Sequence, residues 1–194
     1  MNFKEESIMI KKVVLFLIFI AGFTFSAETA EENSVQETFN SYVKSDEFRK
    51  EYVETGIAQM YSIMAQKGKI FNTDMTKEEI DSEIASILET NFKGIKIEVK
   101  DSKTNKNGEI ELTVNIEGKD VLNPFETNII SSTSQQIMKP DKFIGDFSRY
   151  MRMYSAGKKK IKLTYILQDS EWVLKENEDI KLLSALLLVK NFNE

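Results

Sequence analysis

The chemistry open to this chain is narrow, because two common catalytic residue types are missing. The 194-residue sequence contains neither cysteine nor histidine. Disulfides, thiolate metal sites and Ser-His-Asp or Cys-His nucleophiles are therefore excluded, and the usual general base near neutral pH is absent. The sequence also lacks a phosphate-binding loop and a nucleotide fingerprint. We expect no catalytic residue, no metal site and no cofactor, and the balance favours a protein that is not an enzyme.

A basic cluster interrupts an otherwise acidic chain, whose formal net charge is -5. Its members are Arg149, Arg152, Lys158, Lys159, Lys160 and Lys162. Such a cluster predicts contact with an anionic ligand, an acidic partner or an anionic membrane surface, and Arg149 and Arg152 are the speculative anion contacts. The alternative, which we favour, is that the lysines solubilise a strand end and discourage edge pairing. The acidic balance gives no support for nucleic-acid binding.

The first 27 residues have the layout of a secretory signal. Two lysines precede an apolar run, 13–25, and the small residues Ser26 and Ala27 follow it. We expect cleavage after one of these two residues, with the chain starting at Met1 or Met9.

Signal cleavage would leave a secreted or periplasmic protein. The apolar run has 13 residues, which is short for a membrane span of about 20. We therefore expect no stable membrane span after cleavage, and an uncleaved N-terminal anchor is the alternative. Residues 28–33 are interpreted as a flexible acidic start, and 34–194 as a single domain.

The clearest structural signal is a hairpin from Ile95 to Glu117. Apolar and polar residues alternate on both sides of a polar turn, which is typical of half-buried antiparallel strands. The favoured register places Lys100 opposite Glu111, because cross-strand pairs of opposite charge stabilise a sheet. The alternative register places Glu98 opposite Glu111.

A second hairpin joins strands 158–168 and 171–176 through a two-residue turn. This turn sets Leu167 opposite Trp172 and Tyr165 opposite Leu174, which agrees with the alternation. Leu167 and Tyr165 are expected on the buried face.

Helical periodicity and capping residues predict the helices that cover these hairpins. The first opens at Ser34 and runs to Gly68, with Ser45 as a candidate second N-cap. The other predicted helices cover Thr76 to Asn91, start at Asn123, run from Pro140 to Gly157, and follow Asn177. Residues 131–136 are interpreted as helix or loop, and a final strand is the alternative to the last helix. The fold class is therefore α+β, a curved antiparallel sheet of about four strands packed against several helices.

Two segments resemble parts of a known superfamily. They are IKIEVKDSKTNKNGEIELTVNIE and KKIKLTYILQDSEWVLKEN, the latter followed by a leucine-rich helix. Together they resemble bacterial exported domains of unknown function in the nuclear-transport-factor-2-like, or cystatin-like, superfamily, over roughly residues 34 to 192. The resemblance implies a curved sheet wrapped around helices, with a conical cavity. Many members are lipoproteins, and this chain lacks their cysteine, so its anchoring must differ.

Some members of that superfamily are small enzymes that use an inward aspartate with a tyrosine or histidine. The resemblance makes Tyr42, Asp146, Tyr150 and Tyr165 the corresponding candidates here. Asp146 lies off the apolar stripe of its helix, so we expect it to be solvated. Tyr150 and Tyr165 fit core positions with hydroxyls that reach water, and they are speculative pocket residues.

These observations favour an exported, non-catalytic domain that binds an unidentified ligand or protein in the cell envelope. The first alternative is a small cavity enzyme, an isomerase or hydrolase without histidine. The second is a structural envelope protein that self-associates, as a homodimer for example, through Ile166 and Val173 or through the terminal leucines.

Overall fold

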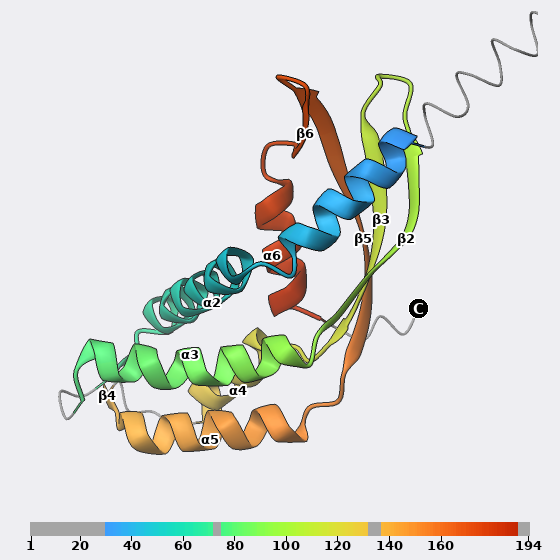
Figure 1. Cartoon of the computed structure of the whole chain (residues 1–194). Coiled ribbons are helices and arrows are strands. Elements are labelled where there is room, and N and C mark those ends of the chain that lie inside the picture. The colour runs from blue at the N-terminus through green and yellow to red at the C-terminus, as the bar shows by residue number, and fades with distance from the viewer. Residues whose placement is uncertain (1–29, 72–74, 132–136, 190–194) are drawn as a thin grey trace, which may run out of the picture.

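A four-stranded antiparallel sheet is the centre of the fold, and it confirms the predicted α+β class (Figure 1). The computed structural model describes residues 30–71, 75–131 and 137–189. The strands follow the order β2-β3-β5-β6 across the sheet. Their bounds are β2 Lys96–Thr104, β3 Ile110–Gly118, β5 Gly157–Gln168 and β6 Glu171–Leu174. The two predicted hairpins are therefore the two halves of one open sheet.

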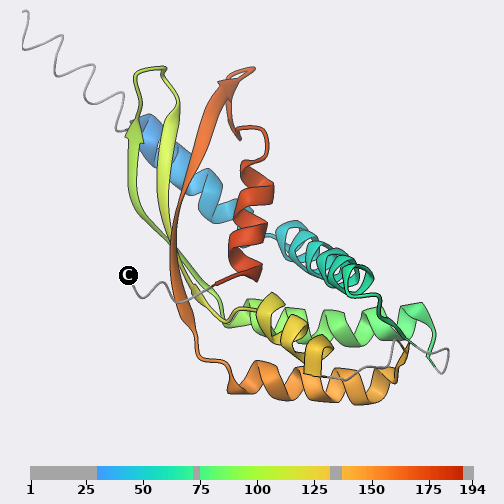
Figure 2. The same ribbon diagram turned by 180° about the vertical axis from the view of Figure 1, so that it is seen from behind.

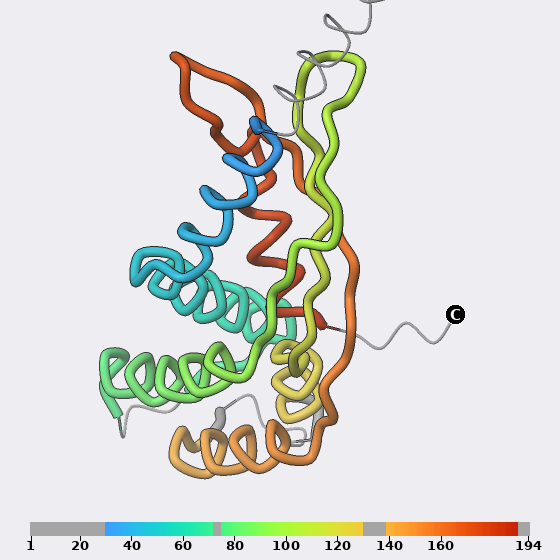
Figure 3. Tube along the Cα trace, turned by 45° about the vertical axis from the view of Figure 1, so that its right-hand side comes forward, coloured from blue at the N-terminus to red at the C-terminus, as the bar shows by residue number. Residues whose placement is uncertain are grey.

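Helices cover one face of the sheet (Figure 3), and most of the side chains on that face are apolar. The central strand β3 buries every second side chain completely or nearly so, which fixes the face that turns inward. These side chains are Ile110, Leu112, Val114 and Ile116. The opposite face displays charged and polar side chains, as the alternation predicts.

The register of the first hairpin differs from both predicted registers. Glu111 lies opposite Lys103, whereas Glu98 lies opposite Asn115. The strands are longer than the alternating pattern suggested. A β-bulge between Val99 and Asp101 shifts the alternation by one residue, so every second side chain beyond the bulge again points inward. The apolar alternation in this strand ends at Val99, so hydrophobic patterning contains no information about this extension.

The register of the second hairpin is confirmed. Tyr165 pairs with Leu174 and Leu167 with Trp172. The turn residues Asp169 and Ser170 both have positive φ, 51° and 69°, which suits a two-residue hairpin turn. Leu167 shares the face of Tyr165, as predicted, but the residue is 57% exposed at the hairpin tip.

Two helices pack on the apolar face, residues 30–42 and α6 Glu178–Leu187 (Figures 1 and 2). The terminal helix is thus confirmed. The predicted helix start at Ser34 is too late, because residues 30–33 are already helical. A Glu32 carboxylate oxygen accepts a hydrogen bond from the backbone amide of Thr104 at 2.8 Å, which ties this first helix to the edge strand β2.

Four more helices gather beyond one end of the sheet (Figure 1). They are α2 Asp46–Gln66, α3 Lys77–Lys93, α4 Leu122–Ser131 and α5 Pro140–Met153. The candidate cap Ser45 does separate two helices, and it accepts a hydrogen bond from the Phe48 amide at 3.0 Å. The predicted capping box of Thr76 and Glu79 is confirmed.

The side chain that caps the first turn of α4 is that of Asp120 rather than that of the predicted Asn123. The Asp120 carboxylate accepts a hydrogen bond from the Asn123 backbone amide at 3.0 Å, and α4 begins at Leu122. Both residue types are good caps. The sequence pattern alone did not show that the helix starts two residues before Pro124.

A two-residue parallel pairing joins β1 Ile70–Phe71 to β4 Ile137–Met138, in segments not predicted to be strands. The predictions for the signal segment, its cleavage and residues 132–136 lie outside the described residues. Within the described ranges, no helix combines the length and apolar character needed to cross a membrane.

Candidate functional site

A pocket of about 570 Å³ opens between helix 30–42, the second hairpin and α6. We call it the Tyr165 pocket. The side chains that line it are Thr38, Tyr42, Tyr165, Trp172, Val173, Leu174, Lys175, Glu176, Asn177, Asp179 and Ile180. Helix 30–42 and the distant C-terminal segment from the second hairpin to α6 therefore supply one concave surface, which combines aromatic walls with a charged rim.

Tyr165 is the deepest polar residue of the pocket. It lies on β5 between Ile110 and Leu174 in the sheet register, and only 2% of its surface is exposed. Burial raises the pKa of its hydroxyl well above the usual value, so the group stays protonated near neutral pH. Among the described residues, no hydrogen-bond partner for this hydroxyl is found. A buried polar group in this condition is uncommon in folded proteins.

Tyr42 presents a second phenol from helix 30–42. Its hydroxyl donates a hydrogen bond to a Glu51 carboxylate oxygen at 2.9 Å. Burial raises the pKa of Tyr42 most strongly, and the neighbouring Glu51, Asp179 and Tyr165 raise it further. Tyr42 is thus a neutral hydrogen-bonded group, with its oxygen lone pairs free to accept a further hydrogen bond.

The rim of the pocket bears an uneven distribution of charge. Lys175 forms an ion pair with Glu109, with 2.7 Å between its Nζ and a carboxylate oxygen. Glu176 and Asp179 have no ion-pair partner among the described residues. The pocket therefore has more unpaired negative than positive charge.

The sequence-predicted pocket residues do not form one site. Tyr165 and Tyr42 meet in the Tyr165 pocket, whereas Tyr150 lies on α5 and is not part of its lining. Asp146 is also on α5, where it pairs with Arg149 at 2.7 Å. The expected solvated role of Asp146 agrees with this surface ion pair, and Arg149 is occupied by it.

Arg152 lines a different hollow, a cleft of about 600 Å³ between α3 and α5. Lys119 also lines it, and its Nζ donates to the Met151 carbonyl at 3.0 Å. The cleft contains several small residues, and the Asn91 amide at its wall donates to the Tyr52 hydroxyl at 3.0 Å. The half-buried polar groups of Asn91 and Lys119 are therefore hydrogen-bonded within the protein itself.

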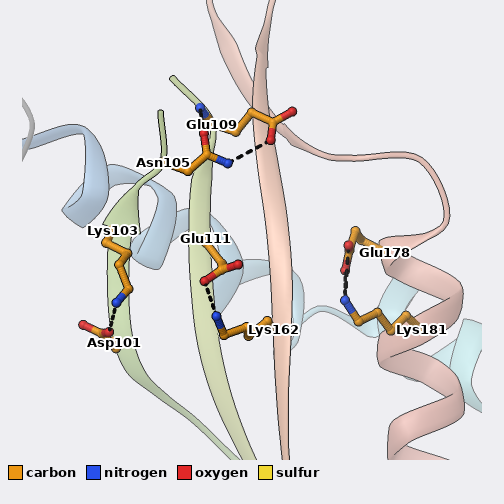
Figure 4. A network of polar contacts seen from close by, with 8 residues as sticks. All are labelled: Asp101, Lys103, Asn105, Glu109, Glu111, Lys162, Glu178 and Lys181. Carbon is orange, nitrogen blue, oxygen red and sulfur yellow. Dashed lines mark hydrogen bonds and ion pairs between the residues drawn. The ribbon is translucent and has the colours of Figure 1, made fainter. Parts of the chain in front are cut away.

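Lys158, Lys160 and Lys162 lie on the uncovered face of the sheet, where many charges are paired, whereas Lys159 lies opposite Ile116 on the other face. Lys162 contacts Glu111 at 2.7 Å across neighbouring strands, and Lys103 contacts Asp101 at 3.5 Å along β2 (Figure 4). Lys158 lies 3.9 Å from Glu117. This pattern of paired surface charges agrees with the interpretation of the lysines as solubilising residues.

No family model matches the chain, and no match was found among curated proteins or among solved structures. The resemblance to the nuclear-transport-factor-2-like superfamily therefore stays a prediction. The described residues include no group of three or more acidic side chains placed to hold a metal ion.

Sequence reasoning missed most of the Tyr165 pocket, including Lys175 and Asp179 in its lining and Glu51, the hydrogen-bond partner of Tyr42. Glu51 has the spacing of an ordinary solvated helix residue, and its meeting with Tyr42 depends on the helix break near Ser45. Asp179 was interpreted as a charge that favours the start of the last helix. Nothing local in the sequence indicated that this turn of helix faces Tyr42.

Proposed function

We propose that this protein is an exported, non-catalytic binding domain of the cell envelope, and that its ligand occupies the Tyr165 pocket. The observation that supports this most directly is the buried Tyr165 hydroxyl, which faces a hollow and has no partner among the described residues. Leaving such a group unbonded costs about 1–3 kcal/mol. A ligand with a hydrogen-bonding group would satisfy it.

The shape and lining of the pocket agree with a small amphipathic ligand. Binding sites for small molecules are concave, mostly apolar, and contain a few placed polar groups. Trp172, Leu174 and Ile180 supply apolar surface, and the two phenols supply the polar groups. The proposed export rests on the signal layout of the first 27 residues.

The test compares compounds retained by two immobilised forms of the full chain, the wild type and Tyr165→Phe. Both are exposed to a small-molecule extract of bacterial envelopes, and retained compounds are identified by mass spectrometry. We expect compounds that the wild type retains and Tyr165→Phe loses. A Tyr154→Phe variant is the control, because Tyr154 lies outside the pocket. Equal retention by all three forms would contradict the proposal.

A small cavity enzyme is the second candidate, and the Tyr42–Glu51 hydrogen bond favours it. A carboxylate beside a phenol in a pocket is an arrangement suited to acid–base chemistry. The pKa of Tyr42 is raised rather than lowered, so the phenol is a poor base near neutral pH. Conversion of a retained compound, lost in Glu51→Gln, would favour this candidate over binding alone.

Self-association has weaker support. The leucines of α6 are largely buried within the chain, at Leu182, Leu183, Leu186 and Leu187. The remaining surface for this alternative is Ile166 and Val173, which pair with each other on the uncovered face of the sheet. A concentration-independent monomer in light scattering would exclude it.

A further inference from the structure

We propose that the Tyr165 pocket binds an organic primary ammonium that has an apolar chain. This inference rests on the proposed function and names the chemical class of its ligand. Three features of the pocket lead to it: the hydrogen-bond acceptors, the unbalanced charge and the apolar walls.

The acceptors match the donors of a primary ammonium. Tyr42 gives its hydroxyl hydrogen to Glu51, which leaves the lone pairs of its oxygen free. Tyr165 has a buried hydroxyl with no described partner. Asp179 lines the same pocket as these two tyrosines. An alkylammonium has three N–H donors and no acceptor, so these three groups can each accept one of its hydrogens.

The charge of the pocket also favours a cation. Its one lysine, Lys175, is held by Glu109 at 2.7 Å. Glu176 and Asp179 have no ion-pair partner in the described part of the chain, and Glu51 is hydrogen-bonded to Tyr42. An anionic ligand would meet unpaired carboxylates, whereas a cation would gain charge-assisted hydrogen bonds.

The walls of the pocket suit an apolar chain. Ile180 is 56% exposed, and Trp172 and Leu174, which share the face of Tyr165, continue this surface along β6. An alkyl chain over these residues would remove apolar surface from water. The Trp172 ring also offers a face to which a cation is attracted.

The test uses four probes with one chain length: hexylammonium, hexyltrimethylammonium, hexan-1-ol and hexanoate. They separate hydrogen bonding, positive charge, an uncharged polar group and negative charge. Trp172 is the only tryptophan of the sequence, so its fluorescence reports on the pocket of the full chain. We expect hexylammonium to bind about tenfold more tightly than each of the other three probes.

Two matched variants locate the effect. Asp179→Asn and Glu178→Gln each remove one negative charge from the first turn of α6, but Glu178 pairs with Lys181 and does not line the pocket. We expect Asp179→Asn to weaken hexylammonium about tenfold and Glu178→Gln to leave its affinity within about twofold. In the wild type, added salt should weaken hexylammonium but not hexan-1-ol, a result that needs no variant to fold.

The outcomes separate this inference from the proposed function. If hexan-1-ol or hexanoate binds as tightly as hexylammonium, and Tyr165→Phe weakens it, the ammonium inference is overturned and the pocket remains a binding site. If no probe changes the fluorescence of Trp172, the ammonium inference is likewise overturned. The retention experiment then decides the proposed function separately.

Discussion

Tyr42 and Glu51 lie on two successive helices, and the Tyr42 hydroxyl donates to the Glu51 carboxylate across the break between them, at 2.9 Å. Ser45 caps the second helix at this break, and its hydroxyl also donates to the Tyr42 carbonyl at 2.7 Å. The two contacts fix the angle between helix 30–42 and α2. Because helix 30–42 forms one wall of the Tyr165 pocket, this angle also shapes the site.

Replacing Tyr42 with phenylalanine removes the Glu51 contact and should destabilise the fold. Hydrogen bonds to charged groups contribute about 1.5–3 kcal/mol, and Glu51 keeps partial access to water, so we expect a loss of about 1–2 kcal/mol. Urea unfolding monitored by circular dichroism measures it. Tyr154→Phe is the control, because no hydrogen bond of its hydroxyl is found within the described ranges, and it should stay within about 0.5 kcal/mol. Equal stability of both variants would mean that the Tyr42 contact is not formed in solution.

Alkaline pH should unfold the protein through its buried and half-buried tyrosines. Burial raises the pKa of Tyr52 to about 12, and the pKa values of Tyr42, Tyr61 and Tyr165 are raised further above the usual 10. A raised pKa in the folded state means that the contribution to stability is complete below pH 10 and is lost as pH rises through the folded values.

Tyrosinate absorbance and circular dichroism, recorded together from pH 9 upward, test this. We expect these four tyrosines to ionise together with loss of helix signal, and the midpoint to rise in Tyr52→Phe. Full ionisation of all tyrosines with an intact helix signal would contradict the burial described here.

The cap of α4 can be tested with two substitutions. Asp120→Ala should cost about 0.5–2 kcal/mol, because the Asp120 carboxylate holds a backbone amide of the first turn. Asn123→Ala should cost less, because its backbone amide still has the Asp120 acceptor. Thermal unfolding of both variants gives the order, and a larger loss in Asn123→Ala would favour the cap predicted from sequence.

The packing between α4 and α5 depends on Phe125. Its ring meets Phe143 and Phe147 edge-on, at centroid distances of 5.3 and 5.4 Å, and it is fully buried. Phe125→Ala should cost about 3–5 kcal/mol through lost burial and a residual cavity. Met153→Ala at the exposed end of α5 is the control, expected within about 0.5 kcal/mol. A loss below 1 kcal/mol in Phe125→Ala would contradict the packing.

Local patterns predicted most of the fold. The Thr76 capping box, the Ser45 cap and the second hairpin each form between residues that are close in sequence. The residue types that form them can therefore be recognised from the sequence alone. The register of the first hairpin was missed because a bulge near Lys100 reverses the alternation, and the polar residues beyond it give no hydrophobic signal. The pairing of Phe71 with Met138 depends on chain segments far apart in sequence.

The candidate site was predicted only in part. Tyr42 and Tyr165 were named from a resemblance, and the structure brings them together, but Tyr150 and Arg152 belong to other surfaces. Asp179 and Trp172 reach the pocket because α6 folds back on the second hairpin. Such a return of the chain is a tertiary arrangement, which residue spacing cannot reveal.

The most direct test of the Tyr165 pocket is the free energy of unfolding of Tyr165→Phe without ligand. A hydroxyl that lacks a partner destabilises the folded state, so its removal should leave stability unchanged or raise it by up to about 1 kcal/mol. That result, beside the loss expected for Tyr42→Phe, would show that the Tyr165 hydroxyl is unsatisfied in the empty protein. A loss of 1 kcal/mol or more in Tyr165→Phe would mean that the hydroxyl already has a partner, and it would contradict the proposal that a ligand supplies one.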